Sequence, residues 1–230
     1  MPKAVARGAL TRVSIEVGTK RTFASALEWP GWSRSGRDEA QALEALAGYA
    51  GRYALVPRVA GLDFAPGVMT SFEVTERVPG NATTDFGAPA VVAAAEEAPL
   101  AAGEAERISA LLAACWEVFD RVANAAPAQL RKGPRGGGRD TDAIVEHVAA
   151  AELAYARKVG IRLGTDLPAT RAAILDLLQG RLVIDPASLD NAKRSGPSHP
   201  SKWPPRYAVR RIAWHVLDHA WEIEDKSVPG

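Results

Sequence analysis

A single cysteine, Cys115, is present in this chain of 230 residues. One cysteine cannot form a disulfide within the chain, so we expect a protein of a reducing compartment, the cytoplasm. It also excludes a zinc finger, which needs several cysteine ligands or a mixture of cysteine and histidine ligands. Because Cys115 lies in an apolar pattern of helical spacing, we interpret it as a buried packing residue rather than a nucleophile.

An excess of charge and a long apolar run are also missing. The formal net charge is +1, and basic residues do not gather on one predicted helix, so we expect no nucleic-acid partner. The Ala/Val-rich stretch near Val91 is interrupted by Glu96 and Glu97, and we expect no membrane span. The first ten residues lack the apolar segment of a secretory signal. Hydrophobic residues make up 47% of the chain and charged residues 24%, which is typical of a globular protein.

Residues 1–80 predict a small α+β module with the order strand, strand, helix, strand. The first two strands are rich in β-branched and aromatic residues, and a Gly-Thr-Lys turn between them indicates a hairpin. Asp38 is a suitable N-cap for the helix, and the third strand alternates apolar with polar residues. We expect the strands at residues 13–17, 21–27 and 70–77, the helix at 39–55 and a turn-rich connector at 28–36.

Residues 103–230 predict a helical domain, preceded by a linker at residues 81–102. The linker is rich in Pro, Gly, Thr and Ala and has no period, and its one large apolar side chain, Phe86, is expected to pack against a domain. Apolar residues then recur at helical spacing. We expect helices at residues 104–125, 141–159, 168–178 and 205–225, with a long irregular connection at 181–203. These elements predict a mainly α protein, a four-helix bundle with one long crossover and a small N-terminal α+β module.

Three of the four histidines lie in predicted helices. His215 and His219 are four residues apart in the last helix and therefore share a face, and His147 lies in the second helix. If these two helices are neighbours, the three imidazoles can converge on one point. Three histidines suit a first-row divalent metal and leave positions open for water or substrate. A pair of core histidines satisfied by hydrogen bonds would show the same pattern. His199 lies in a predicted loop, and we expect it to be solvated.

Carboxylates near the histidines are candidates for orienting the imidazole N–H groups. Asp218 and Glu222 are candidates for this role because of their positions in the last helix, and surface exposure is the alternative for each. Glu146 points about 100° away from its neighbour His147 around an ideal helix, so we do not expect it to be a ligand.

Three arginines are candidates for binding an anionic substrate or thiol. Arg211 precedes His215 by four residues on the same helical face, and its guanidinium can hold a carboxylate or phosphate in bidentate fashion. Arg135 and Arg139 lie in a glycine-rich loop that leads into the second helix, where they can form the lip of a metal pocket. A surface ion pair for Arg211 and a solvated linker for the loop are the alternatives. The loop lacks the spacing of a phosphate-binding P-loop.

Two stretches resemble known families. Residues 104–226 resemble the DinB-like four-helix family, with His147 in AIVEHVAAAELAYARKVG and His215 and His219 in RRIAWHVLDHAWEIED. The resemblance implies a divalent metal, commonly zinc or nickel, bound by these three histidines. It also implies thiol-dependent transferases or isomerases that use a low-molecular-weight thiol such as mycothiol. The N-terminal run WPGWSRSGRDEAQALEALAGYAGRYA weakly resembles the small domain of HicB-type antitoxins, which implies a fold for residues 1–80.

The sequence therefore predicts a metal-binding protein that acts on a small-molecule substrate or thiol. A thiol-dependent transferase or isomerase is the enzymatic hypothesis, and no residue is assigned a catalytic role. The alternative is a non-catalytic binding or regulatory protein whose N-terminal module recognises a partner. A homodimer is compatible with either hypothesis.

Overall fold

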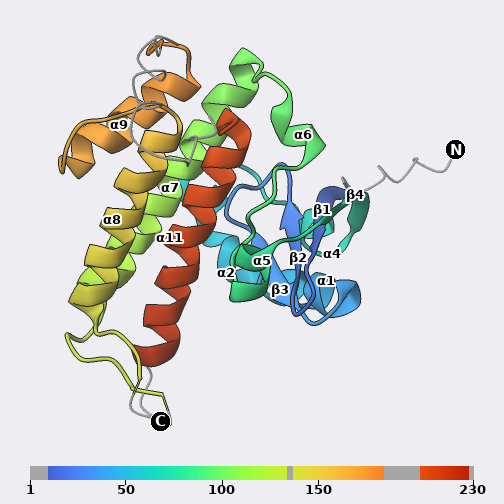
Figure 1. Ribbon diagram of the computed structural model, residues 1–230, viewed down its shortest axis with the longest axis horizontal. Coiled ribbons are helices and arrows are strands. Elements are labelled where there is room, and N and C mark those ends of the chain that lie inside the picture. Colours follow the sequence, from blue (N-terminus) through green and yellow to red (C-terminus); the bar gives the residue numbers. More distant parts are fainter. Residues whose placement is uncertain (1–9, 134–136, 184–202, 228–230) are drawn as a thin grey trace, which may run out of the picture.

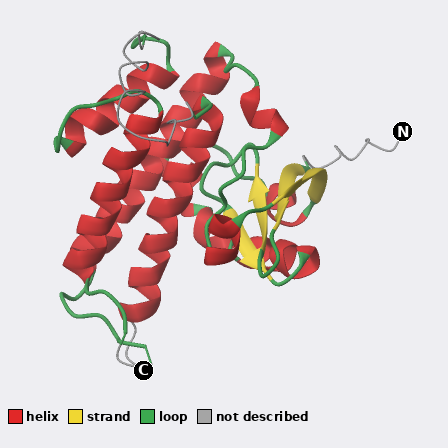
Figure 2. Cartoon of the chain, in the orientation of Figure 1, coloured by secondary structure: helices red, strands yellow, loops and turns green. Residues whose placement is uncertain are grey.

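Helices and a mixed sheet pack side by side in an α+β fold (Figures 1 and 2). The computed structural model describes residues 10–133, 137–183 and 203–227. In chain order the elements are β1 (Thr11–Val17), β2 (Thr22–Ala26), β3 (Ser33–Gly36), α1 (Glu39–Gly48), α2 (Ala50–Tyr53), α3 (Leu55–Val59), α4 (Pro66–Thr70), β4 (Phe72–Pro79), α5 (Ala82–Phe86), α6 (Ala94–Glu97), α7 (Ala102–Ala125), α8 (Thr141–Lys158), α9 (Leu167–Leu178) and α11 (Pro205–Ser227).

The sheet has the strand order β3-β2-β1-β4. β1 pairs antiparallel with β2, which confirms the predicted hairpin, and pairs in parallel with β4. The alternation that predicted β4 appears as alternating half-buried and exposed side chains along the strand. The sequence did not predict β3, because its residues, SRSG, carry no β-branched or aromatic side chain. Backbone pairing with β2 makes this segment a strand, and such pairing leaves no local signal in the sequence.

The Trp-Pro-Gly-Trp turn before β3 joins the sheet to the helices. Trp32 is fully buried, stacks on Tyr53 at 5.5 Å between ring centroids and donates its indole N–H to the carbonyl of Leu46 at 2.8 Å. Gly31 has φ +92°, and a Cβ at this position would lie 2.7 Å from the side chain of Leu217. Only glycine adopts this conformation without strain while allowing so close a contact. The turn is therefore seated against the face of α11.

α11 is the central element of the fold. It contacts α7 and α8 on one side and α6 on another, and the Trp-Pro-Gly-Trp turn packs on it as well. From Tyr207 to Leu217 every residue of α11 is buried. A helix buried all round lies inside a protein core rather than at the edge of a bundle. One continuous hydrophobic core joins the sheet, α1 and the long helices.

The prediction of a mainly α four-helix bundle is wrong. The four-stranded mixed sheet is part of the same packed structure, so the class is α+β. α9 also does not complete a bundle, because its 12 residues are half the length of α7, with 24, and it lies across one end of the long helices (Figure 1). The helices were predicted at nearly the right residues. Their arrangement depends on contacts with the N-terminal elements, which helical periodicity does not reveal.

Buried carboxylates fix the segment between β4 and α7. Glu16 on β1 is 4% exposed and accepts hydrogen bonds from this segment, including the N–H of Val91 at 3.1 Å. Arg210 on α11 pairs with Glu96 and donates to the carbonyl of Val91 at 2.8 Å. The segment also contains two short helices, α5 and α6. Phe86, which the sequence predicted would pack against a domain, is 89% exposed, so that prediction is wrong.

Candidate metal centre

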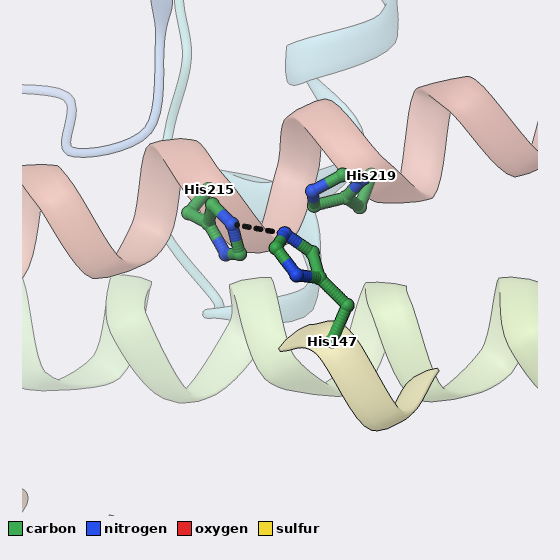
Figure 3. Close-up of side chains that lie close together, drawn as sticks. All are labelled: His147, His215 and His219. Atoms are coloured by element: carbon green, nitrogen blue, oxygen red, sulfur yellow. Dashed lines mark hydrogen bonds between the residues drawn. The ribbon is translucent and has the colours of Figure 1, made fainter. Parts of the chain in front are cut away.

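The three helical histidines come together between α8 and α11 (Figure 3). The ring centroids of His215 and His219 are 4.6 Å apart, and those of His147 and His219 are 4.9 Å apart. One nitrogen from each ring can be chosen so that all three lie within 4.8 Å of one another. The predicted convergence of His147, His215 and His219 is therefore present in the structure.

Local packing explains why the rings face one another. On α8, Ile144 and Val148 are buried on either side of His147, which turns this stretch of the helix toward the core. On α11, four residues separate His215 from His219, slightly more than one turn. The two helices are in contact along this stretch. Helix periodicity and a shared core together aim the three side chains at one volume.

The closest approach is between the Nε2 atoms of His147 and His215, at 3.2 Å (Figure 3). Two imidazole nitrogens bound to one tetrahedral zinc ion, each about 2.0–2.1 Å from the metal, are about 3.3 Å apart. The observed spacing thus fits a shared cation. It equally fits a hydrogen bond in which one of the two nitrogens carries a proton, the alternative that the sequence left open.

A carboxylate fixes the tautomer of His219. Its Nδ1 lies 2.7 Å from Oε2 of Glu222, and Lys226 donates to the other carboxylate oxygen. The hydrogen bond from His219 is the largest of the causes that lower the pKa of Glu222 to about 2, so this carboxylate is ionised at neutral pH. An ionised carboxylate keeps the hydrogen on Nδ1 of His219. The lone pair of Nε2 is then available to coordinate a metal ion. The role predicted for Glu222 matches this contact.

Asp218 does not have the role predicted for it. Its carboxylate accepts a hydrogen bond from Arg34 at 2.8 Å, which ties α11 to β3. Glu222 follows His219 by three residues and therefore lies on the same face of α11, whereas the adjacent Asp218 points about 100° away around an ideal helix.

Two of the three imidazoles, those of His147 and His215, are held in the neutral form. His215 is 7% exposed, and burial, followed by the nearby side chains of His219 and Arg211, lowers its pKa to about 2. Burial is also the main reason why the pKa of His147 is lowered. Neutral imidazoles present the lone pair that a metal needs. Nδ1 of His215 is buried and has no hydrogen-bond partner in the described part of the chain.

Aromatic residues lie beside the histidines, and the sequence did not reveal them as part of the site. Tyr155 lies eight residues after His147 on α8, and its ring is perpendicular to that of His215 at 5.6 Å. Trp203 packs against Tyr155 at 5.3 Å between ring centroids. The sequence contains one sign that Tyr155 belongs to the site. Its spacing of about two turns from His147 places both residues on one side of the helix.

The three candidate arginines have different positions. Arg211 is 8% exposed and lies close enough to His215 to lower its pKa. Arg139 is exposed, and its charge also lowers the pKa of His147 and of His215. Arg135, together with the loop histidine His199, lies outside the described residues. The structure therefore places two of the predicted cations near the histidines.

Two other features of the described residues, Cys115 and a charged cavity, are weaker candidates for a functional site. Cys115 is fully buried, and burial raises the pKa of its thiol, which disfavours the thiolate. A cavity between β1 and α11 is lined by charged residues, but Glu96 pairs with Arg210 and Glu104 pairs with Arg206. None of the three clustered histidines lines this cavity. The histidine cluster is the better candidate for a functional site.

Comparison of this chain with protein-family models, with curated proteins and with solved structures found no match. The resemblances to the DinB-like family and to HicB-type antitoxins stay predictions from the sequence.

Proposed function

We propose that this protein binds one divalent metal ion through His147, His215 and His219. The observation that supports the proposal is the approach of their ring nitrogens to within 4.8 Å, with the tautomer of His219 held by Glu222. Three neutral nitrogen donors suit zinc or nickel and leave a coordination position for another ligand. Carboxylate support of a ligating histidine is the usual arrangement around such metals.

For chemistry, we propose a thiol-dependent transferase or isomerase. A bound divalent metal would act as a Lewis acid that lowers the pKa of a thiol or polarises a carbonyl. The protein's own residues keep His147 and His215 neutral, hold the Nδ1 proton of His219 and place an aromatic side chain, Tyr155, beside the site. The ligand is then a small molecule or a low-molecular-weight thiol. A cytoplasmic location belongs to the same proposal, and no described helix is long and apolar enough to cross a membrane.

The test is elemental analysis of purified protein, wild type beside His147→Ala. We expect close to one equivalent of zinc or nickel in the wild type. The variant should lose most of its metal, because it keeps only two histidine ligands and a stable site of this kind needs three. His147 is half-buried, so the variant is expected to fold, and its circular dichroism spectrum checks this. Equal metal contents in the two folded proteins would contradict the proposal.

The alternative is a non-catalytic binding or regulatory protein whose N-terminal module, residues 1–80, recognises a partner. Phe86 on α5, in the segment that follows this module, is 89% exposed and gives this alternative a residue to test. Affinity purification of the wild type and of Phe86→Ser from native cells tests this alternative. A partner retained by the wild type and lost in the variant, together with no turnover of small thiols, would support it.

A further inference from the structure

Arg211 is a buried cation without a counter-ion in the described part of the chain. It is 8% exposed, and no described residue accepts a hydrogen bond from its Nη1 atom, which is itself buried. Buried charges in proteins are normally paired and hydrogen-bonded, because removing a charge from water is costly. Arg211 therefore has a free hydrogen-bonding group where the fold would otherwise be expected to supply an acceptor.

Two other arginines with little exposed surface show what is missing. Arg210, the preceding residue, pairs with the buried carboxylate of Glu96. Arg171, with a side chain 17% exposed, pairs with Glu152 and Asp120. Each of these guanidinium groups has its carboxylate within the protein. For Arg211, a carboxylate from outside the protein would complete the same arrangement.

The guanidinium of Arg211 is held by two aromatic rings. Its Cζ lies 4.7 Å from the ring centroid of Trp214 and 5.2 Å from that of Tyr155. Such contacts stabilise a cation and fix its position, but they leave the N–H groups free to donate. A fixed guanidinium with an unpaired Nη1 is prepared to donate to a carboxylate.

Arg211 also lies next to the histidine cluster. It precedes His215 by four residues on α11, about 6 Å along the helix axis. The ring of Tyr155 lies against both residues, with its centroid 5.2 Å from Cζ of Arg211 and 5.6 Å from the ring centroid of His215. A small molecule at the histidines is therefore within reach of Arg211.

We propose that Arg211 binds the carboxylate of a small acid whose second donor group, a thiol, hydroxyl or carbonyl, lies at the three histidines. The inference rests on the proposed metal function and names its substrate class. The spacing favours a short molecule, with the two groups on the order of 6 Å apart. One buried positive charge matches one carboxylate, whereas a phosphate would bring a second negative charge that Arg211 does not neutralise.

Two matched probes test the proposal: 3-mercaptopropionate and its neutral amide, titrated calorimetrically into zinc-loaded protein. We expect the wild type to bind the acid about 10- to 100-fold more tightly than the amide, the usual contribution of hydrogen bonds to a charged group. Arg211→Met, of similar length and without charge, should lose this preference and still bind the amide. Arg211→Lys should restore part of it. Arg121→Gln, which removes an exposed charge on α7, should behave as the wild type.

The metal content of every variant is measured first, so that the two proposals can fail separately. If the protein binds no metal, the same comparison is made on metal-free protein with propionate and propionamide. An acid preference that depends on Arg211 would then support the anion site without the metal. Inorganic phosphate forms a further arm, and tighter binding of phosphate than of propionate would overturn the choice of a carboxylate. Equal affinity for acid and amide in the wild type, or a preference unchanged in Arg211→Met, would overturn the proposal.

Discussion

Two carboxylates on α11 flank His219, and they provide a paired test of the metal centre. Glu222→Gln removes the charged acceptor that holds Nδ1 of His219 at 2.7 Å, whereas Asp218→Asn removes the same charge from a residue that instead pairs with Arg34. Both substitutions are nearly isosteric and change the net charge equally. If Glu222 orients the imidazole, only the first substitution should weaken metal binding.

The size of the effect follows from the role of the contact. Loss of a carboxylate that supports a metal-bound histidine costs about 10- to 100-fold in metal affinity, or about 1.4–2.7 kcal/mol. A glutamine oxygen still accepts a hydrogen bond, but a neutral one, which is about half as strong. We therefore expect Glu222→Gln in the lower half of this range. Asp218→Asn should leave the zinc dissociation constant unchanged and lower thermal stability only slightly, since its ion pair is partly exposed.

The assay is competition for zinc between each protein and a chromophoric chelator at neutral pH. Unfolding temperatures of the metal-free proteins are measured in parallel, so that a folding defect is distinguished from a weaker site. Equal weakening in both variants would show that only the negative charge near the site matters, and would refute the argument that Glu222 orients His219. No weakening in either would show that His219 is not a ligand or needs no such support.

Further predictions concern the metal-free protein and the core. Because the pKa of His215 falls from about 6.5 in the unfolded chain to about 2 in the folded protein, the unfolded state takes up more protons below pH 6.5. The contribution of His215 to the free energy of unfolding, measured with urea, should therefore be about 1 kcal/mol lower at pH 5.5 than at pH 6.5. His215→Gln should remove this contribution to the pH dependence of stability. Gly31→Ala should destabilise the protein by at least about 1–3 kcal/mol, because its φ is +92° and the new Cβ would lie 2.7 Å from Leu217. Scanning calorimetry should show an unfolding temperature lower by about 2–4 °C for each kcal/mol, and an unchanged value would contradict the packing described for this turn.

Local signals in the sequence were sufficient for most individual elements. Asp38 was predicted as an N-cap and accepts the N–H of Gln41 at 2.9 Å. Helical spacing of apolar residues located α7, α8, α9 and α11 to within a few residues. Both signals act over one or two turns of chain, so they can be recognised without knowing the rest of the fold.

The histidine cluster was predicted only in part. The shared face of His215 and His219 follows from helix geometry alone, since four residues nearly complete one turn. The approach of His147 required α8 and α11 to be neighbours, which the sequence suggested but did not require. The aromatic surroundings of the cluster, including Tyr155, became visible only when α8 and α11 were seen packed together.

The sequence by itself determined the helices α7, α8, α9 and α11, the hairpin, the paired histidines on one face and the burial of Cys115, because each depends on neighbours in the chain. The single helix predicted at residues 39–55 is divided into α1, α2 and α3, and the short helices α4, α5 and α6 were not predicted. The tertiary structure decided the α+β class, the strand β3, the exposure of Phe86 and the pairing of Asp218 with Arg34. It also decided that Arg211 is buried without a counter-ion beside the histidines. These properties depend on contacts between residues far apart in the chain, where burial and pairing energies exceed local preferences.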